Sequence, residues 1–316
     1  MSGPVGTDDV QSPVVAASMP RAAPFEITPS RETEVGGHRV RRALPRRARR
    51  TVGAWCFIDH MGPASVAGPS GAGIGPHPHT GLQTVTWLLS GELRHRDSLG
   101  SDQVIKPGQL NLMTAGHGVA HAEEGTAYRG ELHGVQLWVA QPDATRDGPS
   151  AFEHHAELPR VELATGEATV LVGELDGAGS TARRDTDHGG FDLSLQVGRS
   201  VLPLNPDFEH AVVVFDGAVL VDGSIIEPGR LGYLSPGREE FAIEARQPAR
   251  ALVVGGVPFP SPIFMWWNFV ARSREEAQAA GAAWNGRDAR FGEVDSTLDR
   301  IAAPAPPWSG RPDTPR

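Results

Sequence analysis

The chain has 316 residues, of which 39% are hydrophobic and 21% are charged, so it is long enough for two packed domains. Its net charge of −9 argues against direct nucleic-acid binding through a broad basic face, and no apolar run is long enough to span a membrane. A single cysteine, Cys56 in the apolar run "WCFI", excludes an intrachain disulfide. Together with an N-terminal segment unlike a signal peptide, it predicts a cytoplasmic protein.

Both ends of the chain are predicted to lack regular structure. Residues 1–22 are rich in Ser, Pro and Gly without hydrophobic periodicity, and residues 296–316 form a Pro-rich tail. Between them, the 38 glycines and 27 prolines of the chain favour short strands and tight turns. The segment around residue 155 is typical of a connector. We therefore expect a first domain over residues 23–150 and a second over residues 151–295.

A run of seven arginines lies between Arg39 and Arg50, near the start of the first domain. The simplest interpretation is a solvated strand and turn. The alternative is a surface that binds an anionic partner or steers an anionic substrate.

Two pairs of polar residues follow along the chain. His77 and His79 stand in "GPHPHTG", and His121 and Glu123 repeat the spacing in "AGHGVAHAEE". Residues i and i+2 of a strand face the same side, so two such pairs on paired strands would bring three imidazoles and one carboxylate together. That donor set suits Fe(II), Mn, Co, Ni, Cu or Zn and leaves positions open for water, dioxygen or substrate. Gln83, four residues after His79, is expected to line the same cavity.

The other histidines have no such spacing. His117 lies in a turn close to the predicted site and is a candidate pocket residue. We expect the following histidines on strand surfaces or in the connector: His95, His133, His154 and His155.

An internal repeat indicates the architecture. The stretch "IKPGQLNLMTAG", starting at Ile105, recurs as "IEPGRLGYLSPG", starting at Ile226, and each copy follows an apolar strand and a glycine turn. Short antiparallel strands with such turns are typical of a sandwich or jelly roll. Aligning the copies places these residues opposite the four predicted ligands: Pro203, Asn205, Ala242 and Glu244. The second copy therefore keeps the turns and loses all three histidines, which supports a functional role for the first set.

One late segment, "SREEAQAAGAAWNG", is plainly helical. Ser273 and Glu276 have the spacing of a capping box, and Gly286 follows as the C-cap. We therefore expect an all-β protein with a short C-terminal helix.

The chain resembles the pirin family of the cupin superfamily from about residue 24 to residue 295. The segments that carry the resemblance are "RRALP", "VGAWCFIDHMGP", "HPHTGLQTVTWLLSGELRHRDSLG", "PGQLNLMTAGHGVAHAEE", "LHGVQLWV" and "SPIFMWWNFVARSREEAQAAGAAWNG". The resemblance implies a bicupin, in which two antiparallel β-barrel (jelly-roll) domains lie face to face. The first would bind one divalent metal ion, usually iron, and the second would be metal-free and closed by the C-terminal helix. The family's ligands fall on His77, His79, His121 and Glu123.

Three positions depart from the family pattern. Many members have Arg, Glu and Arg where this chain has Thr80, Gln83 and His117. The change at Gln83 is expected to remove a carboxylate near the metal without removing a ligand.

The resemblance implies two alternative functions. The first is an Fe(II)-dependent dioxygenase of the quercetin 2,3-dioxygenase type, which acts on an aromatic flavonol and uses Glu123 both as a ligand and as the catalytic base. The second is a non-enzymatic redox-sensing protein that binds a protein partner through its metal domain. The arginine run would then contribute to the surface that the partner contacts.

Overall fold

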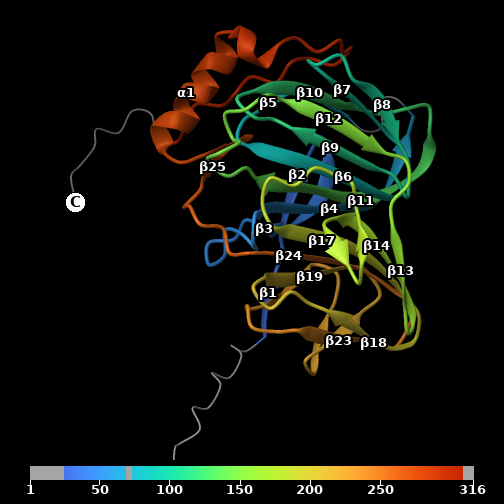
Figure 1. Ribbon diagram of the computed structural model, residues 1–316. Coiled ribbons are helices and arrows are strands. Elements are labelled where there is room, and N and C mark those ends of the chain that lie inside the picture. The colour runs from blue at the N-terminus through green and yellow to red at the C-terminus, as the bar shows by residue number, and fades with distance from the viewer. Residues whose placement is uncertain (1–24, 69–72, 309–316) are drawn as a thin grey trace, which may run out of the picture.

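Two β-barrels of matching topology are stacked in the structure, a computed structural model that describes residues 25–68 and 73–308. The predicted tail over residues 1–22 lies outside the described residues. In Figure 1 the first barrel occupies the upper half of the molecule and the second the lower half. The expected all-β bicupin architecture with one short C-terminal helix is confirmed.

The first barrel consists of a large and a small antiparallel sheet. In spatial order, the large sheet contains β12 (Ala151–His155), β9 (Leu110–Thr114), β6 (Leu82–Ser90), β11 (Arg129–Ala140), β4 (Trp55–Ala67), β3 (His38–Leu44) and β2 (Arg31–Val35). The small sheet contains β5 (Gly73–His79), β10 (Val119–Glu124), β7 (Leu93–Asp97) and β8 (Asp102–Ile105).

The second barrel repeats this order strand for strand. Its large sheet contains β1 (Glu26–Pro29), β22 (Arg230–Leu234), β19 (Glu209–Asp216), β24 (Ala249–Gly256), β17 (His188–Leu195), β14 (Gly166–Val172) and β13 (Arg160–Leu163). Its small sheet contains β18 (Gly198–Pro203), β23 (Glu240–Ala245), β20 (Val219–Val221) and β21 (Ser224–Ile226). The remaining elements are β15 (Glu174–Leu175), β16 (Ala178–Gly179), β25 (Phe264–Trp266), β26 (Phe269–Ala271), the helix α1 (Arg274–Asn285) and the 3-10 turn η1 (Ala289–Phe291).

The two barrels exchange their outermost elements. Strand β1 pairs with β22 of the second barrel, and β12 pairs with β9 of the first. Each of these strands therefore lies in the barrel opposite to the one that predicted limits of 23–150 and 151–295 would give it. Figure 1 shows the same exchange, with β1 in the lower barrel and β12 beside β9 in the upper one.

The C-terminal helix packs against the first barrel, not the second as the family resemblance implied. Trp284 of α1 and Phe291 of η1 form an apolar cluster with Ala120 of β10 and with Phe269 of β26. Farther along the chain, the amide of Ile301 donates to the carbonyl of Pro76 on β5. The helix and the described part of the tail thus cover the outer face of the first small sheet, because that face offers the apolar partners that these aromatic side chains need.

The capping residues of α1 are the predicted ones, with two differences in detail. The Ser273 side chain accepts from the amide of Glu276, as in a capping box, but the Glu276 carboxylate accepts from the amide of Arg272. Gly286 is the C-cap with a φ of −77°, and it is Arg287 that adopts the left-handed conformation. In the part of the chain that the structure describes, no helix has the length and apolar character needed to cross a membrane.

The large sheets of the two barrels share one apolar core. Trp55 of β4 is fully buried there, and its indole Nε1 lies 3.1 Å from the carbonyl oxygen of Gly189 and 3.2 Å from that of Gly255, both in the second barrel. The backbone amide of Gly53 donates to the Glu209 carboxylate at 2.6 Å. The first barrel is thereby held against a second layer across β3, β4, β11, β6 and β9 of its large sheet.

Acidification should weaken the folded state through His188. This side chain of the second barrel is 1% exposed, and burial lowers the pKa of its imidazole to about 4. As the pH falls below about 6.5, the unfolded chain therefore takes up this proton first, so the stability present above that pH is lost progressively down to pH 4. We expect the free energy of unfolding to fall between pH 7 and pH 5 by about 2 kcal/mol less in His188→Gln than in wild type. Urea unfolding at both pH values measures this difference, and equal losses would contradict it.

Candidate metal centre

The small sheet of the first barrel places the two predicted pairs side by side. On the paired strands β5 and β10, His121 lies opposite His77 and Val119 lies opposite His79. Ala120, between the two inward-facing positions of β10, instead packs under Trp284 on the outer face. The alternation expected from the sequence therefore holds for all three histidines.

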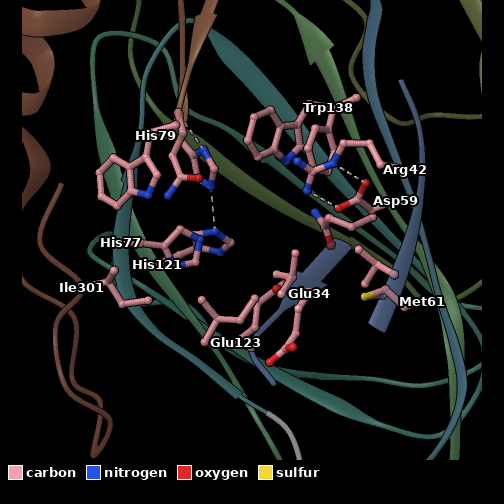
Figure 2. A pocket seen from close by; sticks show the side chains of 18 residues that line it. Glu34, Arg42, Asp59, Met61, His77, His79, His121, Glu123, Trp138 and Ile301 are labelled. Carbon is pink, nitrogen blue, oxygen red and sulfur yellow. Dashed lines mark hydrogen bonds and ion pairs between the residues drawn. The ribbon is translucent and has the colours of Figure 1, made fainter. Parts of the chain in front are cut away.

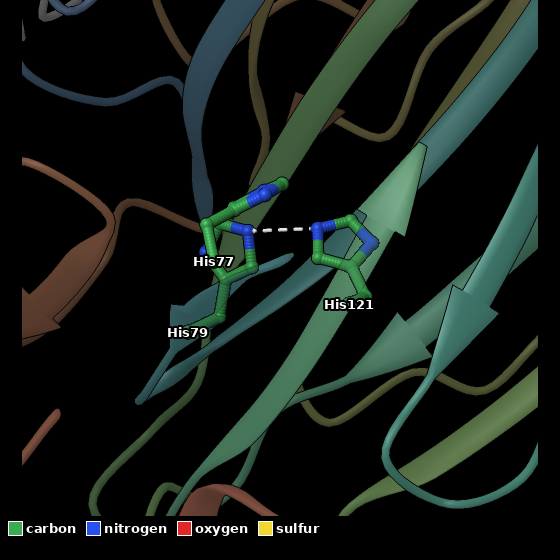
Figure 3. Close-up of side chains that lie close together, drawn as sticks. All are labelled: His77, His79 and His121. Atoms are coloured by element: carbon green, nitrogen blue, oxygen red, sulfur yellow. Dashed lines mark hydrogen bonds between the residues drawn. The ribbon is translucent and has the colours of Figure 1, made fainter. Parts of the chain in front are cut away.

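The three imidazoles form one compact group. Their ligand atoms all lie within 4.8 Å of one another, and the Nε2 atoms of His79 and His121 are 3.1 Å apart. Figure 3 shows the three rings side by side, with a dashed line joining His79 and His121. Two nitrogens that each lie about 2.1 Å from a shared ion show this separation when they subtend about 95° at the ion. The donor set fits a first-row transition metal with adjacent imidazole ligands.

Hydrogen bonds at the opposite ring nitrogens support the same tautomer. Nδ1 of His77 lies 2.8 Å from the carbonyl oxygen of Gly75, and Nδ1 of His79 lies 3.0 Å from that of Asn268. A carbonyl only accepts, so both Nδ1 atoms carry the proton and both Nε2 lone pairs are free. Such a partner on the remote nitrogen is the usual arrangement for a metal-binding histidine.

The buried position keeps the group uncharged. Burial lowers the pKa of His77 to about 4, and it lowers the pKa values of His79 and His121 well below the ordinary range, with the neighbouring imidazoles adding to the effect. Imidazoles in this state offer lone pairs at neutral pH without first losing a proton.

Glu123 lines the same cavity, but its carboxylate is not part of the imidazole group. Strand β10 is regular from His121 to Glu123 along β7, whereas β5 contains an irregularity between the partners of these two residues. Figure 2 shows Glu123 beside Glu34, below His121. Burial raises the pKa of the Glu123 carboxyl group, which makes it a stronger base than an exposed glutamate.

The cavity beside the histidines has a volume of about 450 Å³ and a mixed wall of apolar, polar and charged side chains that includes Phe57, Trp138 and Trp267. Phe57 and Trp138 stack at 4.1 Å between ring centroids, and Trp138 meets the ring of His79 edge-on at 5.1 Å. Arg42 lies over the other face of Phe57 and forms a two-pronged ion pair with Asp59, at 2.8 and 2.6 Å. Figure 2 shows this ion pair across the cavity from the imidazoles. The volume and lining suit a planar aromatic molecule with a few polar groups.

Part of the predicted basic cluster is thus used inside the fold. Arg42 belongs to the cavity wall, and Arg49 pairs with Glu26 and lies over the ring of Tyr233 in the second barrel. Both arginines therefore have structural partners.

A hairpin from the C-terminal segment completes the cavity, and the sequence did not reveal it. Trp267 and Asn268 form the turn between β25 and β26 and line the cavity, and Asn268 supplies the carbonyl that holds His79 from 189 residues away. Trp267 has a φ of +51°, a value rare for a bulky residue and frequent at functional sites. The only available signal was the aromatic stretch "MWWNFV", which does not indicate where the hairpin packs.

Three expectations about neighbouring residues are wrong. Gln83 points away from the cavity, because the turn at residues 80–81 moves it to the face of β6 that carries Val85 and Trp87, and its amide donates to Thr114. His117 is exposed and contacts the carbonyl of Gly148. Two of the histidines expected on strand surfaces are buried, namely His95 beside His121 and His133 against His60.

The second barrel fills the equivalent positions with apolar side chains. Leu93 pairs with Ile105 as Val219 pairs with Ile226, so the two small sheets can be matched residue by residue. Two residues farther along β7, His95 pairs with Glu123 of β10. At the matching place on β20, Val221 pairs with Ile243 of β23. The ladders thus place these residues opposite His77, His79, His121 and Glu123: Leu202, Leu204, Phe241 and Ile243.

The sequence alignment of the two copies is therefore wrong by one residue on both strands. Thr114 to His121 spans seven positions but Ser235 to Phe241 spans six, and His79 to Gly91 spans 12 positions but Leu204 to Gly217 spans 13. The four side chains that replace the predicted ligands belong to, or pack against, the apolar core of the second barrel. The loss of the histidines is thus a replacement of a polar site by a packed core.

Comparisons with known proteins agree with this geometry. Residues 37–139 match the family model described as Pirin, and residues 190–292 match that described as Pirin C-terminal cupin domain. A Pseudomonas aeruginosa protein named "Putative quercetin 2,3-dioxygenase" is 45% identical over 88% of this chain and 90% of its own length. A "Pirin-like protein" of Caulobacter vibrioides is 36% identical over 84% of this chain and 94% of its own. The crystal structure of a quercetin 2,3-dioxygenase from Acinetobacter baumannii is similar with a TM-score of 0.87 and 42% identity, covering 92% of this chain and 97% of that one.

Proposed function

Because the chain belongs to the pirin family of the cupin superfamily, we propose that it is a metal-dependent dioxygenase of the quercetin 2,3-dioxygenase type, with Fe(II) as its ion. One observation carries the proposal: three buried, uncharged imidazoles form one wall of a cavity of about 450 Å³ that also contains stacked aromatic rings. Similarity to a quercetin 2,3-dioxygenase of known structure supports the choice of a flavonol as substrate.

His77, His79 and His121 would hold the ion, with Glu123 as a fourth ligand. When bound, a redox-active ion would transfer electron density between a substrate enolate and dioxygen, which allows the two to react. The overall reaction would consume one flavonol and one dioxygen, open the central ring and release one carbon monoxide.

The protein's own residues would bind and orient the flavonol. Phe57 and Trp138 offer flat apolar surfaces to the substrate rings, and Gln136 and Asn268 place polar groups at the cavity wall. The Glu123 carboxylate, which lines the same cavity, would accept the proton of the substrate hydroxyl group. The ion pair of Arg42 with Asp59 joins β3 to β4 at that side of the cavity.

The redox-sensing alternative receives less support from the fold. Its surface was expected in the arginine run, but Arg42 lies in the cavity wall and Arg49 packs on Tyr233. We therefore give the enzymatic function priority.

A direct assay tests the proposal. Protein loaded anaerobically with Fe(II) should bleach the absorbance of quercetin and release carbon monoxide when air is admitted. His121→Ala should lose this turnover, whereas His117→Ala should retain it, because His117 is an exposed histidine outside the cavity. An absence of turnover with every first-row metal ion would overturn the proposal.

A further inference from the structure

His95 is a buried histidine that contacts the imidazole group without belonging to it. It lies on β7, where it pairs with Glu123 while Asp97 pairs with His121, and its side chain is 5% exposed. Its Nδ1 atom lies 3.4 Å from Nδ1 of His121. His121 is thus the one histidine of the group whose remote nitrogen faces another side chain and not a backbone carbonyl.

Asp97 anchors the other side of the His95 ring. Its Oδ2 atom lies 2.9 Å from Nε2 of His95, and its Oδ1 atom accepts from the backbone amides of Leu99 and Ser101, both at 2.9 Å. Both carboxylate oxygens are therefore occupied, and the carboxylate is held by the turn that follows β7.

The hydrogen-bonded series from His121 through His95 to Asp97 has a defined donor and acceptor at each atom. Asp97 as a carboxylate only accepts, so Nε2 of a neutral His95 donates to it and Nδ1 of His95 is left to accept. The facing Nδ1 of His121 must then carry the proton, which leaves Nε2 of His121 as a lone pair toward the cavity. The three side chains are thus mutually consistent only when His121 presents its Nε2 lone pair to the cavity.

We infer that His95 is a positioning residue, fixed by Asp97, that sets the tautomer and ring orientation of His121 for metal binding. This inference rests on the proposed metal site. Partners of this kind orient metal-binding histidines in many sites, and their loss costs about 10- to 100-fold in metal affinity.

A purely packing role is the alternative explanation, because the His95 ring also stacks on Phe152 at 4.3 Å with an interplanar angle of 14°. Two substitutions separate the two roles. His95→Phe keeps a flat ring against Phe152 but cannot accept a hydrogen bond. His95→Asn loses the ring but can place a carbonyl oxygen near the position of Nδ1.

The experiment measures Ni(II) affinity by competition with a chelating dye and records the visible spectrum of bound Co(II). We expect His95→Phe to bind Ni(II) about 10- to 100-fold more weakly with an altered Co(II) spectrum, and His95→Asn to recover most of the affinity. His154→Phe is the matched control, since His154 lies on β12 and contacts Asn111. Thermal unfolding of the metal-free proteins verifies that each variant is folded. If His95→Phe binds Ni(II) nearly as tightly as wild type and His95→Asn binds it weakly, the role of His95 is packing and the inference is overturned.

Asp97→Asn provides a second test. The amides of Leu99 and Ser101 require an oxygen at Oδ1, so the new amide nitrogen must face His95. His95 would then accept at Nε2 and direct its Nδ1–H toward Nδ1–H of His121, which is unfavourable. We expect a loss of Ni(II) affinity at least as large as that of His95→Phe, and unchanged affinity would count against the inference.

If His121→Ala binds Ni(II) as tightly as wild type, the metal site itself is refuted. If His121→Ala binds weakly and His95→Phe binds normally, only the role of His95 is refuted.

Discussion

Replacing His79 by Ala is expected to abolish stoichiometric metal binding. His79 contributes Nε2 at 3.1 Å from Nε2 of His121, and its Nδ1 is held by Asn268, so both ends of the ring are committed to one position. Only two of the three imidazole ligands would remain in the variant. We therefore expect the affinity for the metal ion to fall by more than about 100-fold, which exceeds the loss typical of a residue that only supports a ligand. Metal analysis after gel filtration without chelator measures the occupancy.

Metal analysis combined with the turnover assay separates the role of Glu123 from those of the histidines. Glu123→Gln keeps an oxygen donor in the cavity but removes the base. It should therefore retain metal with an affinity lowered by about tenfold while losing turnover. A His79→Ala protein that retains one ion per chain would show that the ion binds elsewhere. A Glu123→Gln protein with normal turnover would exclude the carboxylate as the proton acceptor.

The candidate ligands could be found from the sequence because the chemistry is local. His77 with His79 and His121 with Glu123 each have the two-residue spacing of a strand, and β5 and β10 bring the three histidines together, while Glu123 lines the same cavity outside the imidazole group. The internal repeat likewise indicated two barrels, because the Pro-Gly turn at residues 107–108 and its partner at 228–229 both precede buried strands.

The supporting residues could not be found in this way, because their partners are distant in sequence. His95 is 26 residues from His121 and Asn268 is 189 residues from His79, and neither shows a spacing that points to its partner. Gln83 illustrates the converse error, since it has strand spacing from His79 but a two-residue turn intervenes and reverses the face. The exchange of β1 and β12 between barrels escaped prediction for a related reason: these strands have only four and five residues, and their partners on β22 and β9 are distant in sequence.

Strand β4 connects the metal cavity to the interface between the barrels. Phe57 and Asp59 face the cavity, whereas Trp55 and Ile58 face the shared core with the second barrel. The second barrel, in which apolar side chains fill the equivalent positions, is therefore a structural layer under the cavity wall, and its packing should matter for the site of the first barrel.

Replacing Trp55 by Ala is accordingly expected to lower the free energy of unfolding by about 3–5 kcal/mol, the usual cost of deleting a large buried ring. The indole is fully buried, and its Nε1 serves the carbonyl groups of Gly189 and Gly255 on two strands of the second barrel. The substitution creates a cavity at the centre of the interface and leaves both carbonyls without this donor. Trp55→Phe should cost less, because it retains most of the ring and loses only the donor and part of the volume.

Denaturant unfolding followed by two probes tests this expectation. Ile225→Ala is a suitable control, since its side chain is 52% exposed and its loss should change stability by less than about 0.5 kcal/mol. If the interface couples the barrels, wild type should unfold in one transition and Trp55→Ala in two, with the first barrel losing metal before the second unfolds. A loss below about 1 kcal/mol with a single transition would mean that contacts other than this indole join the barrels. The second barrel would then support the cavity wall through the buried hydrogen bonds of Gly53 with Glu209 and of Trp87 with Asp192.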